Sequence, residues 1–325
     1  MSATAAGARV AQQARLLERI RRYGIVAVFV GVFVLLLLTL PQFRTAANLS
    51  NILQQNSVIG IIACGMTFAI ISGGFDLSVG AGAALASVVS ARLMIDAGIP
   101  LGVAGGIGAG LLLGAINGVL IAVIGINPFV STLGTATIVR GLIYVATNAT
   151  PFFGVPIAFT EVGLGRTGPL PNAAWIFLAT LALLGFVLHQ TRFGHYVYAV
   201  GGNETAAAEM GIGVQRIIVA VYALVGACAG IAGIILTGQT ASGQPQAAIN
   251  YELTAITAVI VGGASLGGGR GGMGGTVVGV FLLGLVSNAL NLYGVSAFWQ
   301  PVATGLILVA AVGIDSLSRR GASMA

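Results

Sequence analysis

A succession of apolar segments, separated by short breaks rich in Gly, Pro and Asn, constrains this chain more than any other feature. An α-helix needs about 20 apolar residues to cross the hydrocarbon core of a bilayer. Backbone groups in lipid must also be satisfied within the segment, which favours helices. Ten membrane-spanning helices are predicted, at 24–40, 56–73, 77–95, 101–124, 129–147, 173–190, 216–237, 252–266, 274–292 and 297–315.

The composition excludes a soluble domain. Of the 325 residues, 57% are hydrophobic and only 7% are charged, against about a quarter in soluble domains. The 50 glycines suit helices whose backbones pack closely in lipid. We therefore predict an all-α polytopic membrane protein of about ten transmembrane helices, with an internal repeat and both termini in the cytoplasm.

The predicted organisation has three parts. Residues 1–23 form a basic cytoplasmic tail, 24–315 form the transmembrane domain, and 316–325 form a second cytoplasmic tail. Within the transmembrane domain, 191–215 is a cytoplasmic loop and the proline-rich stretch 148–172 is an external loop. The first apolar segment is long for a signal peptide and no clear cleavage site follows it, so an uncleaved span is expected.

The arginines fix the predicted orientation. All 14 basic residues are Arg, and the absence of Lys excludes ATP hydrolysis by a P-loop, which needs its Lys. Five of them lie in the first 22 residues, as in an anchor at an anionic leaflet, and no nucleic-acid partner is expected. Ten spans place most arginines in the cytoplasm, as the positive-inside rule requires. These are Arg9, Arg15, Arg19, Arg21, Arg22, Arg192, Arg216, Arg270, Arg319 and Arg320.

No pattern typical of an enzyme is present in the sequence. Cys64 and Cys228 lie in apolar segments without a CxxC spacing and are expected to be small buried hydrophobes. His189 and His195 form no metal-ligand pair. No catalytic residue, metal or cofactor is therefore expected in this chain.

Asp76 and Ser78 lie in a glycine-rich break between two apolar segments. A carboxylate at membrane depth costs about 2.5–3.5 kcal/mol on insertion scales, so its presence there favours a functional role. One interpretation is a helix break beside a translocation path. The other is an N-cap of the third span. The sequence leaves both open.

An internal repeat aligns 69–80 with 258–269, with six identities in twelve positions. The alignment pairs the region of Asp76 with that of Ser265. Interrupted helices at matching places in two halves point to a transport path. The predicted spans make both segments run in the same direction. Residues 267–272 are expected to form a tight cytoplasmic hairpin rather than a dinucleotide-binding loop.

Polar side chains enter several spans. Asn127, Phe129 and Thr132 lie at the start of the fifth span, and Asn288, Trp299 and Gln300 lie near the ninth and tenth. Such groups bond neighbouring helices, and they also suit an uncharged sugar or polyol. No ladder of ionisable residues runs through the spans, which argues against a proton or ion relay.

The cytoplasmic stretch 192–212 is amphipathic and helix-prone. Asn203 or Thr205 is expected to cap a short helix that runs to Met210 and ends at Gly211. An ordinary loop and a docking helix for a soluble partner are both compatible with this pattern.

Three motifs together resemble the bacterial ABC sugar permeases of the ribose and xylose type. GMT at 65–67 with GGFDLSVG at 73–80 resembles their GMT…GGIDLSVG signature. Residues 128–142 resemble their PF…TLGT…RGL segment, and 193–212 resemble their cytoplasmic FGR…GGNeeAA…GI loop. The likeness runs from about 48 to 315. Phe75 and His195 depart from it, standing where the family usually has Ile and Arg.

The resemblance implies the permease subunit of an ATP-driven importer in the bacterial inner membrane, with a monosaccharide (a ribose- or xylose-like pentose, or a hexose) or a polyol as its substrate. It implies a second permease copy, a periplasmic sugar-binding protein and a cytoplasmic ATPase that binds the ATP and Mg. The ATPase-coupling residues it implies are Gly194, His195, Gly201, Gly202, Asn203, Glu204, Ala206, Ala207 and Gly211. Branched-chain amino acid import by a neighbouring family, and secondary transport without ATP, remain the alternatives.

Overall fold

The computed structural model describes residues 24–323, with side chains as far as 313, so the predicted tail 1–23 lies outside the described residues. Within them, seven helices are long and apolar enough to cross a membrane. They are α2 (Ala46–Ile71), α3 (Val79–Ala97), α4 (Ile99–Ala122), α5 (Pro128–Thr147), α7 (Asn172–Gln190), α10 (Val214–Thr240) and α12 (Met273–Leu292).

Three shorter apolar helices complete the described bundle. They cover Gly24–Thr39, α11 (Tyr251–Val261) and the apolar part Trp299–Gly313 of α13 (Trp299–Ser323). The all-α polytopic fold is thereby confirmed. The number of crossings and the side of each terminus stay predictions, although the described part supplies as many apolar helices as the sequence analysis expects.

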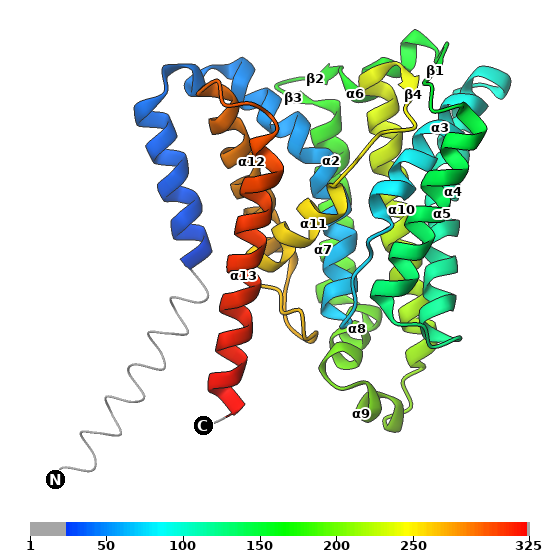
Figure 1. The fold of residues 1–325 in the computed structure, drawn as a ribbon, viewed down its shortest axis with the longest axis vertical. Coiled ribbons are helices and arrows are strands. Elements are labelled where there is room, and N and C mark those ends of the chain that lie inside the picture. Colours follow the sequence, from blue (N-terminus) through cyan, green and yellow to red (C-terminus); the bar gives the residue numbers. More distant parts are fainter. Residues whose placement is uncertain (1–23, 324–325) are drawn as a thin grey trace.

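The two ends of the bundle differ (Figure 1). One end carries α8 (Arg192–Gly202) and α9 (Glu204–Glu209), and the free ends of helix 24–39 and α13 point the same way. The opposite end carries the 3-10 helices η1 (Pro41–Arg44) and η2 (Ile157–Phe159), and the short helix α6 (Thr160–Gly163). Two small antiparallel ladders also lie there, β1 (Phe152–Phe153) with β4 (Ser242–Gly243), and β2 (Arg166–Thr167) with β3 (Leu170–Pro171).

Glycines bring α4 and α10 into backbone contact. A methyl group at Gly110 would lie 2.8 Å from Gly230 Cα, and one at Gly226 would lie 2.9 Å from Gly114 Cα. Without a hydrophobic driving force between helices in lipid, such close van der Waals packing is what holds them together. The glycines recur every four residues along one face of α4, at Gly102, Gly106, Gly110, Gly114 and Gly118.

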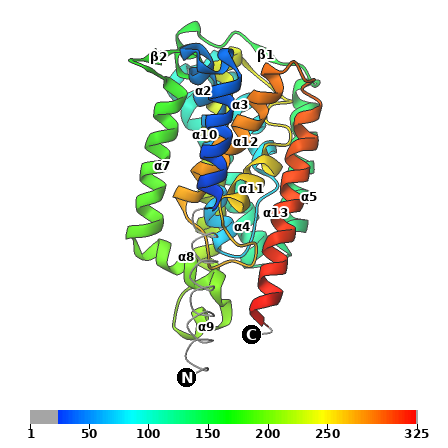
Figure 2. The same ribbon diagram turned by 90° about the vertical axis from the view of Figure 1, so that its left-hand side faces the viewer.

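The protein core surrounds α2. Its residues 60–71 are buried without exception, and they contact α7, α10, α11 and α12. In contrast, only 17% of the apolar stretch of α5 is buried within the chain. One face of the molecule therefore carries α5 and α13 at its edges, with α11 between them (Figures 1 and 2).

Two helices begin inside the bundle rather than at its ends. After α2 the chain turns back as the non-helical segment 72–78 before α3 begins, and after α10 it returns through 244–250 before α11 begins. The two units run in opposite directions in Figure 1, with α2 descending and α10 ascending. Each unit is thus a long helix, an inward-returning segment and a helix that begins inside the bundle, the arrangement of inverted transporter repeats.

The shorter repeat predicted from sequence has a different register. As predicted, α2 and α11 run in the same direction. Both end in the same turn, with Gly73 at φ +90 and Gly263 at φ +94. Gly74 N donates to Ala69 O, and Ala264 N donates to Val259 O. The structure therefore pairs Gly73 with Gly263, one position away from the sequence alignment, because the helix-ending glycine rather than the glycine-rich composition sets the equivalence.

Candidate functional site

Asp76 is buried inside the bundle, with 1% of its surface exposed. Its Oδ1 accepts hydrogen bonds from the Ser78 backbone N–H (2.7 Å) and the Ser78 hydroxyl (2.6 Å), which folds the segment 72–78 into an Asx-type turn. Ser78 occupies the N-cap position of α3, but its side chain makes no cap bond. The carboxylate therefore shapes the break between α2 and α3.

Neighbouring helices hold this turn through a polar network. Asn117 of α4 donates to the Ser78 hydroxyl (2.8 Å) and accepts from Thr135 of α5 (2.7 Å). Thr132 of α5 accepts from the Leu77 backbone N–H (3.1 Å). On the other side, the Tyr222 hydroxyl of α10 donates to Phe75 O (3.2 Å). Three helices thus satisfy a stretch of irregular backbone that lipid would not tolerate unpaired.

The second inward-returning segment has its own support from α5. Arg140 Nη1 donates to Pro245 O (3.1 Å) and Ala247 O (2.9 Å). Glu252, in the first turn of α11, places its carboxylate against Gly80 at the start of α3. Sequence analysis did not select either residue as a site residue. An acidic and a basic residue within apolar segments were the signal available for finding them.

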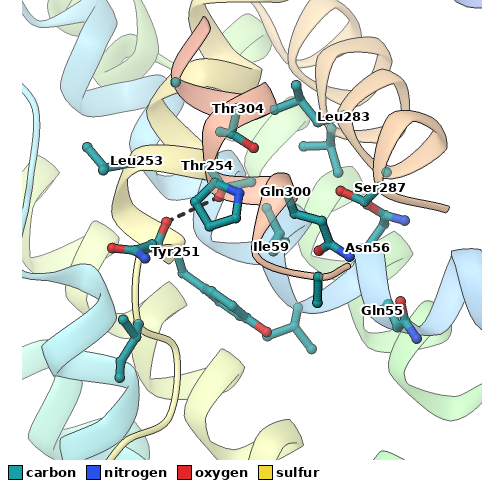
Figure 3. Close-up of a pocket in the computed structure, with 18 of the residues that line it drawn as sticks. Gln55, Asn56, Ile59, Tyr251, Leu253, Thr254, Leu283, Ser287, Gln300 and Thr304 are labelled. Atoms are coloured by element: carbon teal, nitrogen blue, oxygen red, sulfur yellow. Dashed lines mark hydrogen bonds between the residues drawn. The ribbon is translucent and has the colours of Figure 1, made fainter. Parts of the chain in front are cut away.

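A cavity of about 490 Å³ opens between α2, α11, α12 and α13 (Figure 3). Asn56, Ser287 and Gln300 reach its wall from three different helices. Among the residues that the structure describes, no charged side chain lines it. Its polar lining consists of amides and hydroxyls: Gln55, Asn56, Gln239, Asn250, Tyr251, Thr254, Ser287, Gln300 and Thr304. We call this the amide cavity.

A second, more open cavity of about 420 Å³ lies on the other side of the start of α11. Arg140 and Glu252 both line it, together with Thr137 and Tyr144 of α5. Because Tyr251 and Thr254 line the amide cavity while Glu252 lines this one, the first turn of α11 separates the two.

The predicted path residues are dispersed through the fold. Of these residues, Gln300 lines the amide cavity. Asp76, Ser78 and Thr132 belong to the polar network described above. Asn288 instead exchanges two hydrogen bonds with Asn48, at 3.1 and 2.8 Å, which ties α12 to α2.

The remaining candidates lie at element ends. Asn127 is exposed and caps α5 by accepting from the Phe129 backbone N–H (2.9 Å). Phe129 is itself half exposed and packs edge-on against Phe75. Ser265 shapes the hairpin after α11 by accepting from the Gly268 backbone N–H (2.9 Å). Trp299, at the first position of α13, is largely exposed.

The short helix predicted within 192–212 is present as α9. Asn203 Oδ1 accepts from the Ala206 backbone N–H (3.0 Å) and caps α9, and Gly211 follows with φ +80. The predicted cap at Asn203 and the predicted helix end at Gly211 are therefore confirmed. Of the coupling residues, Ala207 is buried and Gly194 packs against the end of α7. Exposed side chains occur at His195, Asn203, Glu204 and Ala206.

The end of α8 contacts both units of the bundle. Gly201 packs against the carbonyl of Ile71, the last residue of α2, and a methyl group there would lie 2.9 Å from Gly269 N. Gly269 N also donates to Ile71 O (2.8 Å), and the Tyr198 hydroxyl donates to Gly271 O (2.8 Å). Burial raises the pKa of Tyr198 above its ordinary value, so the phenol stays protonated and remains a donor.

Comparison with known proteins gives a consistent result. Over 284 residues the chain is 41% identical to the ribose import permease protein RbsC of Escherichia coli K12, covering 85% of this chain and 88% of the relative. It is 42% identical over 293 residues to RbsC of Bacillus subtilis 168, covering 88% and 91%.

A third relative is the L-arabinose transport system permease protein AraH of Escherichia coli K12, 39% identical over 300 residues and 92% of each chain. No solved structure matches the chain. The family model for the permease component of the branched-chain amino acid transport system matches residues 48–312. The chain therefore belongs to this permease family.

Proposed function

We propose that this protein is the permease subunit of an ATP-driven importer of a pentose-class monosaccharide in the bacterial inner membrane. The observation that carries the proposal is the identity of 41–42% with ribose import permeases along most of the chain. The L-arabinose relative is nearly as similar, so the proposal names the class of sugar rather than one sugar.

The chemistry of the amide cavity supports a sugar over an amino acid. A zwitterion needs a partner for each of its charges, and no charged side chain lines the amide cavity. Amides and hydroxyls both donate and accept hydrogen bonds, as sugar hydroxyls require. The branched-chain amino acid alternative is therefore not favoured, although the family model carries that description.

We further propose that α8 and α9 receive the cytoplasmic ATPase, which binds ATP and Mg and carries out hydrolysis. The support is the exposed, capped helix α9 at one end of the bundle, next to an α8 that contacts both α2 and the hairpin after α11. A closing motion of the ATPase would reach the segment 72–78 and the hairpin after α11 through Gly201.

The other end of the bundle is proposed to meet the periplasmic sugar-binding protein. A second copy of this chain is proposed to cover the face that carries α5 and α13. Large apolar side chains on α5 are exposed there, including Phe129, Leu142 and Val145. The predicted cytoplasmic placement of both termini is part of this proposal.

The test is the ATPase activity of this chain assembled with its ATPase in nanodiscs, measured with a panel of sugar-loaded binding proteins. We expect one pentose-loaded binding protein to stimulate hydrolysis. Failure of the chain to assemble with any ATPase, together with uptake that survives vanadate but is lost with an uncoupler, would replace the proposal with secondary transport.

The docking surface has a separate test. Glu204→Arg combined with Gly202→Trp reverses a charge at the start of α9 and adds bulk at the exposed end of α8, where a methyl group at Gly202 meets no atom within 4 Å. We expect coupled uptake to be abolished while the permease remains in the membrane. Uptake at the wild-type rate would contradict the docking assignment.

A further inference from the structure

The amide cavity holds more hydrogen-bonding capacity than the protein uses. Among the described residues, the side chains of Gln55, Gln239 and Ser287 make no hydrogen bond, and neither does that of Thr304. Amides exposed to lipid without a partner are costly, because hydrocarbon offers no replacement for the hydrogen bonds of water. These side chains therefore face water or a polar ligand.

The cavity also has the dimensions and position of a ligand site. Its volume of about 490 Å³ falls within the range of about 300–1,000 Å³ that is usual for small-molecule sites. Gln55 and Asn56 belong to the first half of α2, Gln239 to the end of α10 and Ser287 to the second half of α12. All of these lie in the half of the bundle away from α8 and α9 (Figure 1).

The floor of the cavity is the break before α11. Asn250 and Tyr251 line it, and they directly follow the segment whose carbonyls Arg140 holds. A ligand in the cavity would thus rest on the one part of this unit that is not continuous helix. Helix breaks of this kind are where transporters bind substrate.

From these observations we infer that the amide cavity is the sugar site of the permease, where Gln55, Gln239, Ser287 and Thr304 bind the hydroxyls of the sugar released into it. This inference rests on the proposed function. It predicts that the cavity is filled once per transport cycle from the end opposite to α9.

Gly305 offers a way to fill the cavity without disturbing the backbone. It lines the cavity, and a methyl group at this position meets no atom within 4 Å. Gly313 lies on the same helix with equally free space and does not line the cavity. Gly305→Leu and Gly313→Leu are therefore a matched pair on α13, the helix proposed to meet the second copy, and of the two only Gly305 lines the cavity.

The experiment uses the complete importer in vesicles, with its ATPase and binding protein, and measures uptake of D-ribose and L-arabinose beside ATPase stimulation. We expect Gly305→Leu to lose uptake more than tenfold while the loaded binding protein still stimulates hydrolysis. Gly313→Leu should transport at the wild-type rate. Equal uptake by the two variants would overturn the inference, and so would a joint loss of uptake and stimulation in an assembled Gly305→Leu complex.

Gln239→Leu provides a second variant that removes an amide at similar volume. We expect it to slow ribose uptake several-fold. Uptake of a deoxypentose that lacks the hydroxyl bonded by Gln239 should be slowed by a smaller factor. An unchanged preference between ribose and all deoxypentoses would contradict the assignment of Gln239. If the wild-type complex moves no sugar at all, the proposed function itself fails, and this outcome is distinct from any result with the variants.

Discussion

Several polar side chains inside the bundle form hydrogen bonds with backbone groups of the non-helical segments. Thr132 accepts from Leu77 N, and Arg140 donates to two carbonyls of the segment before α11. Each of these side chains supplies a hydrogen-bond partner to non-helical backbone that would otherwise be unpaired in the membrane. A hydrogen bond contributes about 0.5–1.5 kcal/mol net, but an abandoned buried group costs about 1–3 kcal/mol. The penalty for removal therefore exceeds the value of the bond.

Asn117 is the residue at which this asymmetry is easiest to test. Asn117→Leu removes the donor to Ser78 and the acceptor of Thr135, so the buried hydroxyl of Ser78 and the half-buried hydroxyl of Thr135 each lose a partner. We expect the purified permease to lose about 1–3 kcal/mol of stability, measured by unfolding in detergent. Thr137→Val is the control, since Thr137 bonds only the carbonyl of Leu133 in its own helix. Equal effects of the two changes would contradict the network.

Arg140 should resist replacement by lysine. Both of its hydrogen bonds come from Nη1 of a rigid, weakly hydrated guanidinium, whereas the ammonium of lysine is strongly hydrated and sits on a flexible stem, which suits a partly buried site less well. We expect Arg140→Lys to reduce sugar uptake about tenfold and to raise hydrogen exchange in 244–250. Exchange unchanged in that segment would show that Arg140 does not hold it.

At the scale of elements, helix ends were harder to predict than helices. The second span was predicted from 56, whereas α2 begins at Ala46 after the cap at Thr45. The N-terminal part of α2 carries polar residues such as Asn48 and Gln55, which face Asn288 and the amide cavity rather than lipid. The eighth span was predicted to reach 266, yet α11 ends at Val261 because Gly263 takes a positive φ. Hydropathy alone registers neither effect.

The candidate site was predictable only in part, because local sequence patterns do not show which helices come together. The glycine-rich break at Asp76 and the cap at Asn203 are local patterns, and the sequence contains them in full. The amide cavity is assembled where α2 meets α10, α11, α12 and α13, which come much later in the chain, and of the residues predicted for the path only Gln300 lines it. Its other amides resemble the ordinary bonding groups of a helix bundle until the fold shows that they lack partners.

The contact between α4 and α10 gives a prediction for a pair of elements. Gly110→Leu would force the two backbones apart, because its Cβ would meet Gly226 and Gly230. We expect a loss of about 1–3 kcal/mol or more, and reduced yield of folded protein. Gly108→Leu is the matched control on the same helix, with no atom within 4 Å of the added carbon. Similar yields and melting temperatures for both would contradict the close packing.

The contact between α8 and the rest of the bundle gives a second prediction for a pair of elements. Gly201→Val places a side chain on the carbonyl of Ile71 and against Gly269, whereas Gly202→Val meets no atom within 4 Å. We expect Gly201→Val to lower the melting temperature of the isolated permease and Gly202→Val to leave it near the wild-type value. The comparison is made on the isolated permease so that binding of the ATPase does not enter. Equal melting temperatures would show that α8 is not seated as described.

On the scale of the whole molecule, one chain encloses the amide cavity, but its α5 face is open. We expect this face to be covered by a second copy, because exposed apolar α5 residues such as Leu142 and Val145 flank a cavity that contains Arg140 and Glu252. Native mass spectrometry of the complex with the ATPase should give two permease copies. A complex with a single copy would contradict this expectation.

The packing of Gly201 has a consequence for the order in which the two parts of the bundle can move. Gly201 contacts both the end of α2 and the hairpin that follows α11, so a displacement of α8 would act on these two places together. Because both contacts are made by the same residue, neither would move without the other. A state in which one unit has moved and the other has not would be strained at this junction. If the ATPase docks at α8 as proposed, the scarcity of such intermediates would limit passive leakage of sugar, in addition to how tightly either unit closes.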